Sequence, residues 1–334
     1  MPDDDAAAND AHEDDPDDDV LPTGLCVSLA EPGIFDGIKE ADYHRDPCPV
    51  PSLSRSVLAK LLSLTPSHAH AIHPRLGGRA AVDRGTEDDA ADFGTAAHSS
   101  FLQGRSDIVL APFRDWRTKK AKEMRQQAYA DGKIALLQTS YGRAMRLIDV
   151  LEHYRARTGA FCRGKAEQTL VWTEGQVWCR ARVDWLPDDP SEPLRDLKTT
   201  AGFATLNAWT RVAYEKRADL QDVFYGRGAE TLRGEDPTPM IFTVVEQKPP
   251  FGIREFQMTP IARDLARDDV LVGTSLWENC LAMGLWPSYP AEPEYIWPPT
   301  YWMREREGRT GRDPTLGREH PNAVSYIETG NFGG

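Results

Sequence analysis

The amino-acid sequence predicts an α/β fold in which a central mixed sheet is flanked by helices and preceded by a mainly helical N-terminal region. Residues 167–173 and 177–186 alternate as strands do, and Glu174-Gly175-Gln176 between them is a hairpin signal. Before residue 160, apolar residues instead recur with the spacing of helices. Beyond the hairpin we expect strands and helical stretches in mixed order, at about 194–199 (strand), 204–232 (helix), 240–247 (strand), 251–257 (strand) and 260–283 (helix).

Capping signals divide the N-terminal region into helices. Ser52 or Ser54 can cap a first helix, whose apolar face is formed by Val57, Leu58, Leu61 and Leu62. Residues 74–92 are rich in Gly, Arg and Asp and are expected to form a loop. Later helices are expected at Gly94–Gln103, at about Trp116–Ala130, and from Thr139 to Gly159 with apolar positions at Met145, Ile148 and Leu151.

The chain is long enough for one large domain, which we place between two tails. The domain covers residues 31–302, with a mainly helical part at 31–160 and an α/β part at 161–302. Residues 1–30 and 303–334 lack apolar periodicity and are expected to be disordered.

The charge of the chain is unevenly distributed. The formal net charge is −13, but ten of the 52 acidic residues lie within residues 1–19, where there is no lysine or arginine. The remaining 42 acidic residues face 39 basic ones, so the rest of the chain has a net charge of −3 and can carry a local basic groove. We expect the acidic tail to be a solvated segment. The alternative is a mimic of DNA that suppresses non-specific binding.

The cysteines indicate a reducing compartment. The chain has five cysteines, Cys26, Cys48, Cys162, Cys179 and Cys280. No two have the spacing of zinc ligands, and an odd number of cysteines does not suggest a disulfide framework. No apolar run is long enough to cross a membrane, and the N-terminus lacks the pattern of a signal peptide. We therefore expect a cytoplasmic protein with reduced thiols.

Acidic residues and a lysine occur together on the three predicted strands in the middle of the chain. Glu167 opens the first strand, and Asp184 ends the second on its polar face. Asp196 and Lys198 are two residues apart on the third strand and therefore share a face. Adjacent strands can bring these side chains together.

An acidic residue two positions before a lysine is a weak signal alone, because it also occurs at Asp131-Gly132-Lys133 and Glu246-Gln247-Lys248. The former lies at a glycine turn, and no hairpin delivers a second carboxylate to the latter. The triplet beginning at Asp196 is favoured because Glu167 and Asp184 lie on the neighbouring predicted strands. Gln221 and Tyr225, four residues apart on a predicted helix, share a face that can join it.

These residue types suit metal-dependent hydrolysis. Mg²⁺ prefers oxygen ligands and usually takes one or two protein carboxylates together with water and phosphate. A bound cation lowers the pKa of its water, and Lys198 can orient that water or stabilise charge on a phosphate. His98 lies on a helix of small residues. Alone it would more often be structural, but beside carboxylates it is a candidate ligand, for Mn²⁺ more than for Mg²⁺.

The ordered set of motifs resembles the RecB-like branch of the PD-(D/E)XK nucleases, and most closely the phage and prophage exodeoxyribonuclease VIII (RecE-type) exonucleases. The resemblance covers about residues 33–302. It is carried by Gly33-Ile34-Phe35-Asp36, Gly94-Thr95-Ala96-Ala97-His98, Cys179-Arg180-Ala181-Arg182-Val183-Asp184, Asp196-Leu197-Lys198-Thr199-Thr200 and Gln221-x-x-x-Tyr225. It implies a core like that of the restriction endonucleases.

The resemblance also implies a role for each site residue. Lys198 would be the catalytic lysine, and Gln221 and Tyr225 would position DNA or the attacking group. Glu167 would bind or orient a second metal or its water. The metal, Mg²⁺ with Mn²⁺ as the alternative, would be held by His98, Asp184, Asp196 and the carbonyl of Leu197. Some relatives carry a four-cysteine iron–sulfur cluster, but only Cys280 follows the motifs here, so we expect none.

The implied activity is that of a metal-dependent exodeoxyribonuclease. It would digest one strand from a duplex DNA end, 5′ to 3′, and leave a 3′ single strand for an annealing protein in recombination. A ring-shaped homo-oligomer threaded by DNA is implied as well. From the residues themselves we expect two surfaces that contact DNA. One is a basic helix with Trp116, Arg117, Lys119 and Lys120, for phosphate and base contacts. The other is the strand face that carries Asp184, where Arg180 and Arg182 would contact phosphate.

Other functions stay open at this point. The motifs do not separate an exonuclease from an endonuclease or a single-strand nuclease of the same fold. A non-catalytic DNA-binding protein could keep the fold, although every motif residue is present. A small-molecule-binding α/β protein is disfavoured because no glycine-rich phosphate loop is found. For the basic helix, the alternative is an ordinary solvated face.

Overall fold

The computed structural model describes residues 28–77, 89–104, 108–235 and 239–310. The chain divides into two units, Met1–Ser288 and Tyr289–Gly334. In the second unit, helix α10 spans Thr300–Thr310, where we expected no regular structure beyond residue 302. The acidic segment 1–19 and residues 311–334 lie outside the described residues.

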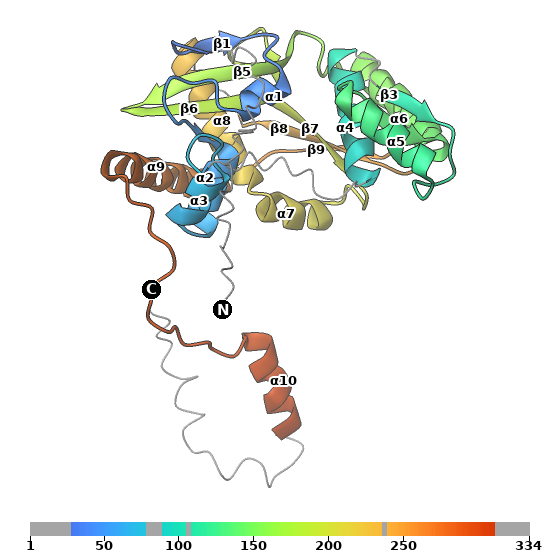
Figure 1. Cartoon of the computed structure of the whole chain (residues 1–334). Coiled ribbons are helices and arrows are strands. Elements are labelled where there is room, and N and C mark those ends of the chain that lie inside the picture. Colours follow the sequence, from blue (N-terminus) through green and yellow to red (C-terminus); the bar gives the residue numbers. More distant parts are fainter. Residues whose placement is uncertain (1–27, 78–88, 105–107, 236–238, 311–334) are drawn as a thin grey trace, which may run out of the picture. The chain divides into compact units, whose positions relative to one another are not determined.

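A seven-stranded mixed sheet forms the centre of the first unit (Figure 1), in the order β1-β5-β6-β7-β8-β9 with β2 beside β6. Pairing is parallel between β2 and β6 and between β7 and β8, and antiparallel elsewhere. The predicted mixed sheet is therefore confirmed. The strands are β1 (Gly33–Phe35), β2 (Leu53–Ser54), β5 (Gly164–Glu174), β6 (Val177–Pro187), β7 (Arg195–Thr200), β8 (Ile241–Glu246) and β9 (Ile253–Phe256).

Strands β5 and β6 form the predicted hairpin. Gly175 adopts a φ of 60° in its turn, a conformation that glycine tolerates. Along β6 the alternation is also as predicted, with Val177, Cys179, Ala181 and Val183 buried. Strand β7 pairs with β6 only through Trp185 and Arg195, so the two strands diverge beyond that pair. This divergence opens space between the strands that carry the predicted carboxylates.

Helices cover both faces of the sheet. Helix α8 (Ala218–Arg233) packs on β5 and β6, while α2 (Arg55–Ser63) and α9 (Pro260–Met283) pack on α8. The core on this side includes Trp172, Phe224, Phe242 and Trp277. Helices α1 (Glu40–His44), α3 (Pro66–Ile72) and α7 (Leu206–Glu215) complete this part of the unit.

A second core lies on the opposite face, where α4 (Asp89–Gln103) and α6 (Gln138–Thr158) pack on each other. Neighbouring β8 residues show the division, because Val244 belongs to the first core and Val245 to the second. Helix α5 (Lys119–Ala130) lies beside a two-stranded parallel sheet that we did not predict, formed by β3 (Ile108–Ala111) and β4 (Ile134–Leu137). Apolar runs of four residues are too short for periodicity to identify.

Several boundaries differ from those expected. Helix α4 begins at Asp89, inside the stretch expected to be a loop, and α5 begins only at Lys119, with Thr118 as its cap. The helical stretch at 204–232 is two helices, separated at Arg217, which has a φ of 52°. The buried face of α6 is formed by Ala144, Leu147 and Leu151, whereas Met145 is exposed.

Candidate active site

Helix α4 brings His98 to the sheet because small residues let the helix approach closely. Phe93, Ala96 and Ala97 are fully buried on its inner face. At Gly94, a Cβ atom would lie 2.7 Å from Oγ1 of Thr199 on β7, closer than real Cβ contacts come. The glycine therefore sets the distance between α4 and β7, and with it the position of His98.

Three side chains of types that can bind a metal meet where α4 approaches β5 and β6. His98 Nε2 lies 2.8 Å from Oδ2 of Asp184, and its Nδ1 lies 3.4 Å from Oε1 of Glu167. One ligand atom from each of the three lies within 4.8 Å of the others. A nitrogen and two carboxylates at this spacing form a donor set that suits a hard divalent cation.

Glu167 has an unusual backbone for a strand residue. Its φ is 54°, in the left-handed region that side chains other than glycine rarely adopt. The β5–β6 ladder pairs Ala166 with Trp185 and Gln168 with Val183, and skips the intervening pair of Glu167 and Asp184. Both residues of the skipped pair thus turn carboxylates toward His98, an observation consistent with strain stored at a functional site.

Arg182 holds the Glu167 side chain. Its Nε donates to Oε2 of Glu167 at 2.5 Å, and its Nη1 donates to the carbonyl of Ile38 at 2.7 Å. The guanidinium thus links the carboxylate to the segment that precedes α1. The sequence predicts that Arg182 contacts DNA, whereas in the structure one of its nitrogens binds the Glu167 carboxylate of the site and another binds the Ile38 carbonyl.

The Asp196 carboxylate forms a second group beside the first. Its side chain is 1% exposed, Lys198 Nζ lies 2.7 Å from its Oδ2, and Gln221 Nε2 donates to its Oδ1 at 2.5 Å. The backbone N–H of Leu197 donates to Oδ2 of Asp184 at 2.8 Å. The Asp184 carboxylate on β6 is thus hydrogen-bonded to the backbone of β7, beyond the single residue pair that joins the two strands.

The charges in the site shift one another's protonation. Burial disfavours a charged His98, but Asp184 and then Glu167 outweigh it and raise the pKa of His98 to about 9. Burial likewise acts to raise the pKa of Asp184, but His98 and Lys198 lower it to about 2. For Asp196, burial and the charge of Asp184 raise the pKa against the opposing effects of Lys198 and Gln221.

Lys198 stays a cation in this setting. Burial acts to lower its pKa, but the charges of Asp196 and Asp184 raise it overall. Tyr225, one turn after Gln221 on α8, is buried, and burial together with the nearby charge of Tyr43 raises the pKa of its hydroxyl well above the usual range. Tyr225 is therefore a neutral hydroxyl group at neutral pH.

Contacts in the structure join seven residues of the predicted site, but not as one metal cluster: His98, Glu167, Asp184, Asp196, Leu197, Lys198 and Gln221. His98, Glu167 and Asp184 form the compact donor group, while Asp196 is held by Lys198 and Gln221. At Leu197 the backbone N–H contacts Asp184, and the metal contact of its carbonyl stays a prediction. The donor set fits a divalent cation held first by the histidine and the two carboxylates on β5 and β6.

The prediction that Arg180 contacts DNA is wrong. The Arg180 side chain is buried, and its Nη1 lies 3.1 Å from Oδ1 of Asp46 and donates to the Ser52 carbonyl at 3.0 Å. The segment that carries Asp46 and Ser52 covers the polar face of β6 at Arg180, which alternation alone could not reveal. Strand alternation separates the two faces of a sheet, but it does not show which face meets water.

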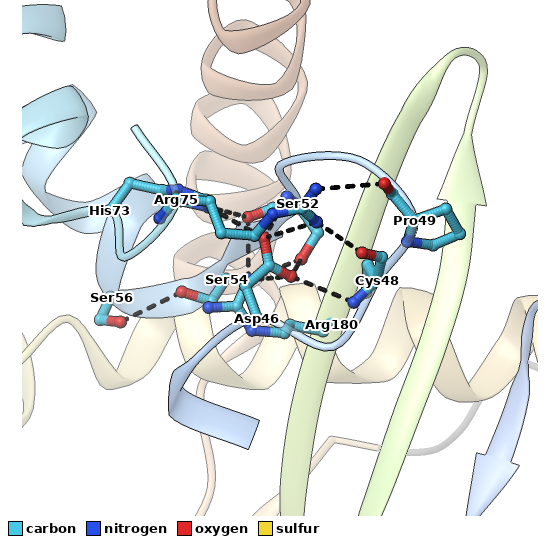
Figure 2. A network of polar contacts seen from close by, with 9 residues as sticks. All are labelled: Asp46, Cys48, Pro49, Ser52, Ser54, Ser56, His73, Arg75 and Arg180. Carbon is cyan, nitrogen blue, oxygen red and sulfur yellow. Dashed lines mark hydrogen bonds and ion pairs between the residues drawn. The ribbon is translucent and has the colours of Figure 1, made fainter. Parts of the chain in front are cut away.

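The partner of Arg180 is a buried polar network that sequence reasoning missed (Figure 2). Asp46 accepts from Ser52 N at 2.9 Å and from Ser52 Oγ at 2.6 Å, and His73 Nε2 lies 3.3 Å from its Oδ2. Burial acts to raise the pKa of Asp46, but hydrogen bonds from His73 and Ser52 and the charge of Arg180 lower it overall. The network ties the segment before α2 to β6, and a φ of 63° at Asp46 could not have been read from the sequence.

The predicted basic helix is less open than expected. Trp116 packs beside Ala111 and Ala128, and the Arg125 guanidinium lies 4.8 Å from the centre of its ring. Arg125, which the sequence places among the basic residues of this helix, is itself buried and donates to Asp92 at 2.6 Å. Exposed cations remain at Arg117, Lys119 and Lys120, two of them beside the carboxylates of Asp115 and Glu123.

The fold and the assembled carboxylates, lysine and histidine define a PDDEXK-like protein. A family model described as "PDDEXK-like domain of unknown function (DUF3799)" matches residues 54–297, and the chain belongs to this family. Among solved structures, it is similar to one from Eubacterium rectale described as a "Putative exonuclease". The two share 14% identity and a TM-score of 0.50, over 77% of this chain and 94% of that one. No curated protein matches the chain.

In the part of the chain that the structure describes, no helix is long and apolar enough to span a membrane. The described cysteines Cys48, Cys162, Cys179 and Cys280 are free thiols.

Proposed function

We propose that the protein is a metal-dependent nuclease that hydrolyses phosphodiester bonds in DNA. The observation that carries this proposal is the meeting of His98, Glu167 and Asp184 within 4.8 Å, next to the Asp196–Lys198 pair. Family membership and the likeness to a protein described as an exonuclease support it. Mg²⁺ is the proposed cation, with Mn²⁺ as the alternative, because carboxylates dominate the donor set.

Each site residue has a proposed task. The cation would be held by His98, Glu167 and Asp184, with Asp196 and the backbone of Leu197 beside it, and would supply an activated water and polarise the phosphate. Lys198 Nζ, a cation with a raised pKa, would stabilise the charge that develops on the phosphate. Its ammonium is held in place by Asp196.

The helix α8 residues would position the reacting groups. Gln221 Nε2 donates to Asp196 and so fixes the carboxylate that holds the lysine. The Tyr225 hydroxyl, kept neutral by burial, can donate a hydrogen bond to a phosphate or to the attacking group. Glu167 and Asp184 are anchored in turn by Arg182 and Leu197, so they need little rearrangement to bind a cation.

The proposed mode is exonucleolytic digestion from duplex ends, 5′ to 3′, leaving 3′ single strands for an annealing protein. The motifs shared with the RecE-type exonucleases support this mode, and the description of the E. rectale structure supports its exonucleolytic part alone. A ring-shaped homo-oligomer would make such digestion processive.

A digestion assay tests this function. Linear duplex, nicked circle and covalently closed circle would be incubated with Mg²⁺, each with the wild type and with Lys198→Ala. Loss of the linear duplex alone, absent in the mutant, is the expected result, and labels at the 5′ or 3′ end would then report the polarity.

Other outcomes decide against parts of the proposal. Cutting of the closed circle would favour an endonuclease, and digestion of unpaired strands only would favour a single-strand nuclease. If the wild type binds DNA but cuts no substrate with Mg²⁺ or Mn²⁺, the protein is a non-catalytic DNA-binding protein of the same fold.

A further inference from the structure

The loop that directly follows β7 displays an aromatic side chain on an anchored backbone. Phe203 is 74% exposed, although its neighbours are fixed. The N–H of Gly202 donates to Thr200 Oγ1 at 3.2 Å, and the N–H of Ala204 donates to Glu246 Oε1 at 2.9 Å. The phenyl ring is therefore exposed to solvent on a loop whose backbone is held by hydrogen bonds on both sides of Phe203.

Helix α7 extends this exposed apolar surface. Thr205 caps the helix, and only Trp209 and Ala213 on its inner face are buried. Leu206 and Tyr214 are both exposed and are offset by about 80° around the helix, a little over two turns apart along it. Together with Phe203 they give the segment that follows β7 a group of exposed apolar and aromatic side chains.

The same segment carries cations. Arg211 and Lys216 are exposed, and among the described residues no carboxylate is paired with Arg211. Lys216 Nζ lies 3.2 Å from Glu215, its immediate neighbour, in an exposed pair that contributes little. Arg55, the first residue of α2, donates to the Lys216 carbonyl at 3.1 Å, which brings a third cation to the end of α7.

Exposed aromatic side chains interleaved with cations are the features that bind single-stranded nucleic acid. Bases stack on the rings whatever their sequence, and arginine and lysine neutralise the phosphates. Five residues of chain span at most about 17 Å, so Phe203 lies within a few nucleotides of a phosphate placed at Lys198. Its loop is also continuous with the strand that carries Asp196 and Lys198.

We propose that Phe203, Leu206, Tyr214 and the cations Arg211, Lys216 and Arg55 form a stacking surface for the single strand next to the bond that is cut. This inference rests on the proposed nuclease function, because it places the strand by its distance from Lys198. It assigns base stacking to Phe203 and Tyr214, and phosphate contacts to the cations.

The test measures binding separately from cleavage. The full chain carrying Lys198→Ala would be titrated into a short single-stranded oligonucleotide that contains 2-aminopurine, whose fluorescence falls when it stacks on an aromatic ring. Phe203→Ala in this background is expected to raise Kd about tenfold, because stacking on one ring contributes about this much, and to reduce the fluorescence change, since Tyr214 remains. Phe203→Trp is expected to keep both.

Ile261→Ala is the matched control, because Ile261 on α9 is 75% exposed and lies outside the proposed surface. It should leave both signals unchanged. An unchanged Kd and fluorescence for Phe203→Ala, or equal losses for both variants, would overturn the inference.

Digestion by the wild type, assayed in parallel, separates the two proposals. If the wild type digests DNA but binding does not depend on Phe203, the nuclease function is supported and the stacking surface is refuted. Binding that depends on Phe203 without digestion would overturn the nuclease function and, with it, the placement of the surface next to a cut bond, and would leave only a site that binds single strands. A Phe203 variant that binds DNA normally but no longer captures a protein would assign the patch to a protein partner and overturn the inference.

Discussion

Lys198 is the residue whose loss should separate chemistry from metal binding. It contacts Asp196, while the compact donor group is formed by His98, Glu167 and Asp184. We expect Lys198→Ala to lower the rate of cleavage by at least about 100-fold, as removal of a group that stabilises developing charge does. Affinity for Mn²⁺, measured by calorimetry, should stay within a few-fold of wild type.

Lys248 offers a matched control for this substitution. It closes a second triplet of the same spacing, Glu246-Gln247-Lys248, and is exposed. Lys248→Ala should cleave at the wild-type rate. Wild-type cleavage by Lys198→Ala, or loss of cleavage in both variants, would contradict the assignment.

His98 should make metal binding depend on pH. With a pKa of about 9, its imidazole is protonated at neutral pH, whereas a metal ligand must be neutral. Binding of Mn²⁺ at pH 7.5 should therefore release about one proton, and the apparent affinity should rise up to about tenfold per pH unit until pH 9.

Calorimetry in two buffers with different ionisation enthalpies would count that proton. His98→Asn should bind Mn²⁺ more weakly and should release no proton. Equal proton counts for the two proteins would show that His98 is not deprotonated by the metal.

At the scale of the element, the close approach of α4 to β7 should depend on Gly94. Gly94→Ala places a methyl group 2.7 Å from Oγ1 of Thr199, an atom that also accepts a hydrogen bond from Gln247 at 3.0 Å. Overpacking of this kind costs about 1–3 kcal/mol. We expect the helix to move away from the sheet, and cleavage to fall about tenfold with His98 displaced.

A control and a rescue make this prediction specific. A methyl group added at Gly142 on α6 would meet no atom within 4 Å, so Gly142→Ala should leave cleavage unchanged and can raise stability by up to about 1 kcal/mol. Thr199→Ala should restore cleavage to Gly94→Ala by removing the clashing oxygen. Failure of that rescue would place the defect elsewhere.

Elements with strong local signals were predictable, and those fixed by tertiary contacts were not. The β5–β6 hairpin and α9 follow from turn residues and a long apolar period, and both were found with nearly the expected bounds. Strands β3 and β4 have only four residues each, and their pairing joins segments far apart in the chain. The start of α4 was missed because its first residues are acidic and small rather than apolar.

At the scale of the whole molecule, the Asp46 network should govern stability in acid. Asp46 is ionised in the folded state with a lowered pKa, so its contribution is complete above the ordinary carboxyl value near 4 and is lost as the pH falls through its lower folded value. Asp46→Asn leaves Arg180 buried without its counter-charge. It should lower the free energy of unfolding at pH 7 by about 3–5 kcal/mol.

Urea unfolding at pH 7 and near pH 3 would measure this effect. The difference between wild type and Asp46→Asn should shrink in acid, because protonation of the Asp46 carboxyl in the unfolded wild type removes part of the advantage of the folded state. Asp264→Asn, at an exposed pair with Arg267, is the control and should change little at either pH. A difference that does not depend on pH would mean that the charge of Asp46 is unimportant.

The site as a whole was predictable from the sequence in composition but not in arrangement. The order of His98, Glu167, Asp184, Asp196 and Lys198 along the chain sufficed to nominate them. Their division into two groups could not be foreseen, since it depends on where β6 and β7 diverge. The burial of Arg180 depends on a segment more than 100 residues earlier in the chain.

The left-handed backbone conformation of Glu167 lowers the stability of the protein at a residue that we expect to be needed for activity. A non-glycine residue there carries roughly 1–2 kcal/mol of strain that glycine would relieve. A screen for heat-resistant variants should therefore enrich Glu167→Gly, and the variants it enriches should have lost cleavage. Directed evolution for thermal stability would thus replace Glu167, a member of the donor group, unless each round also selects for turnover.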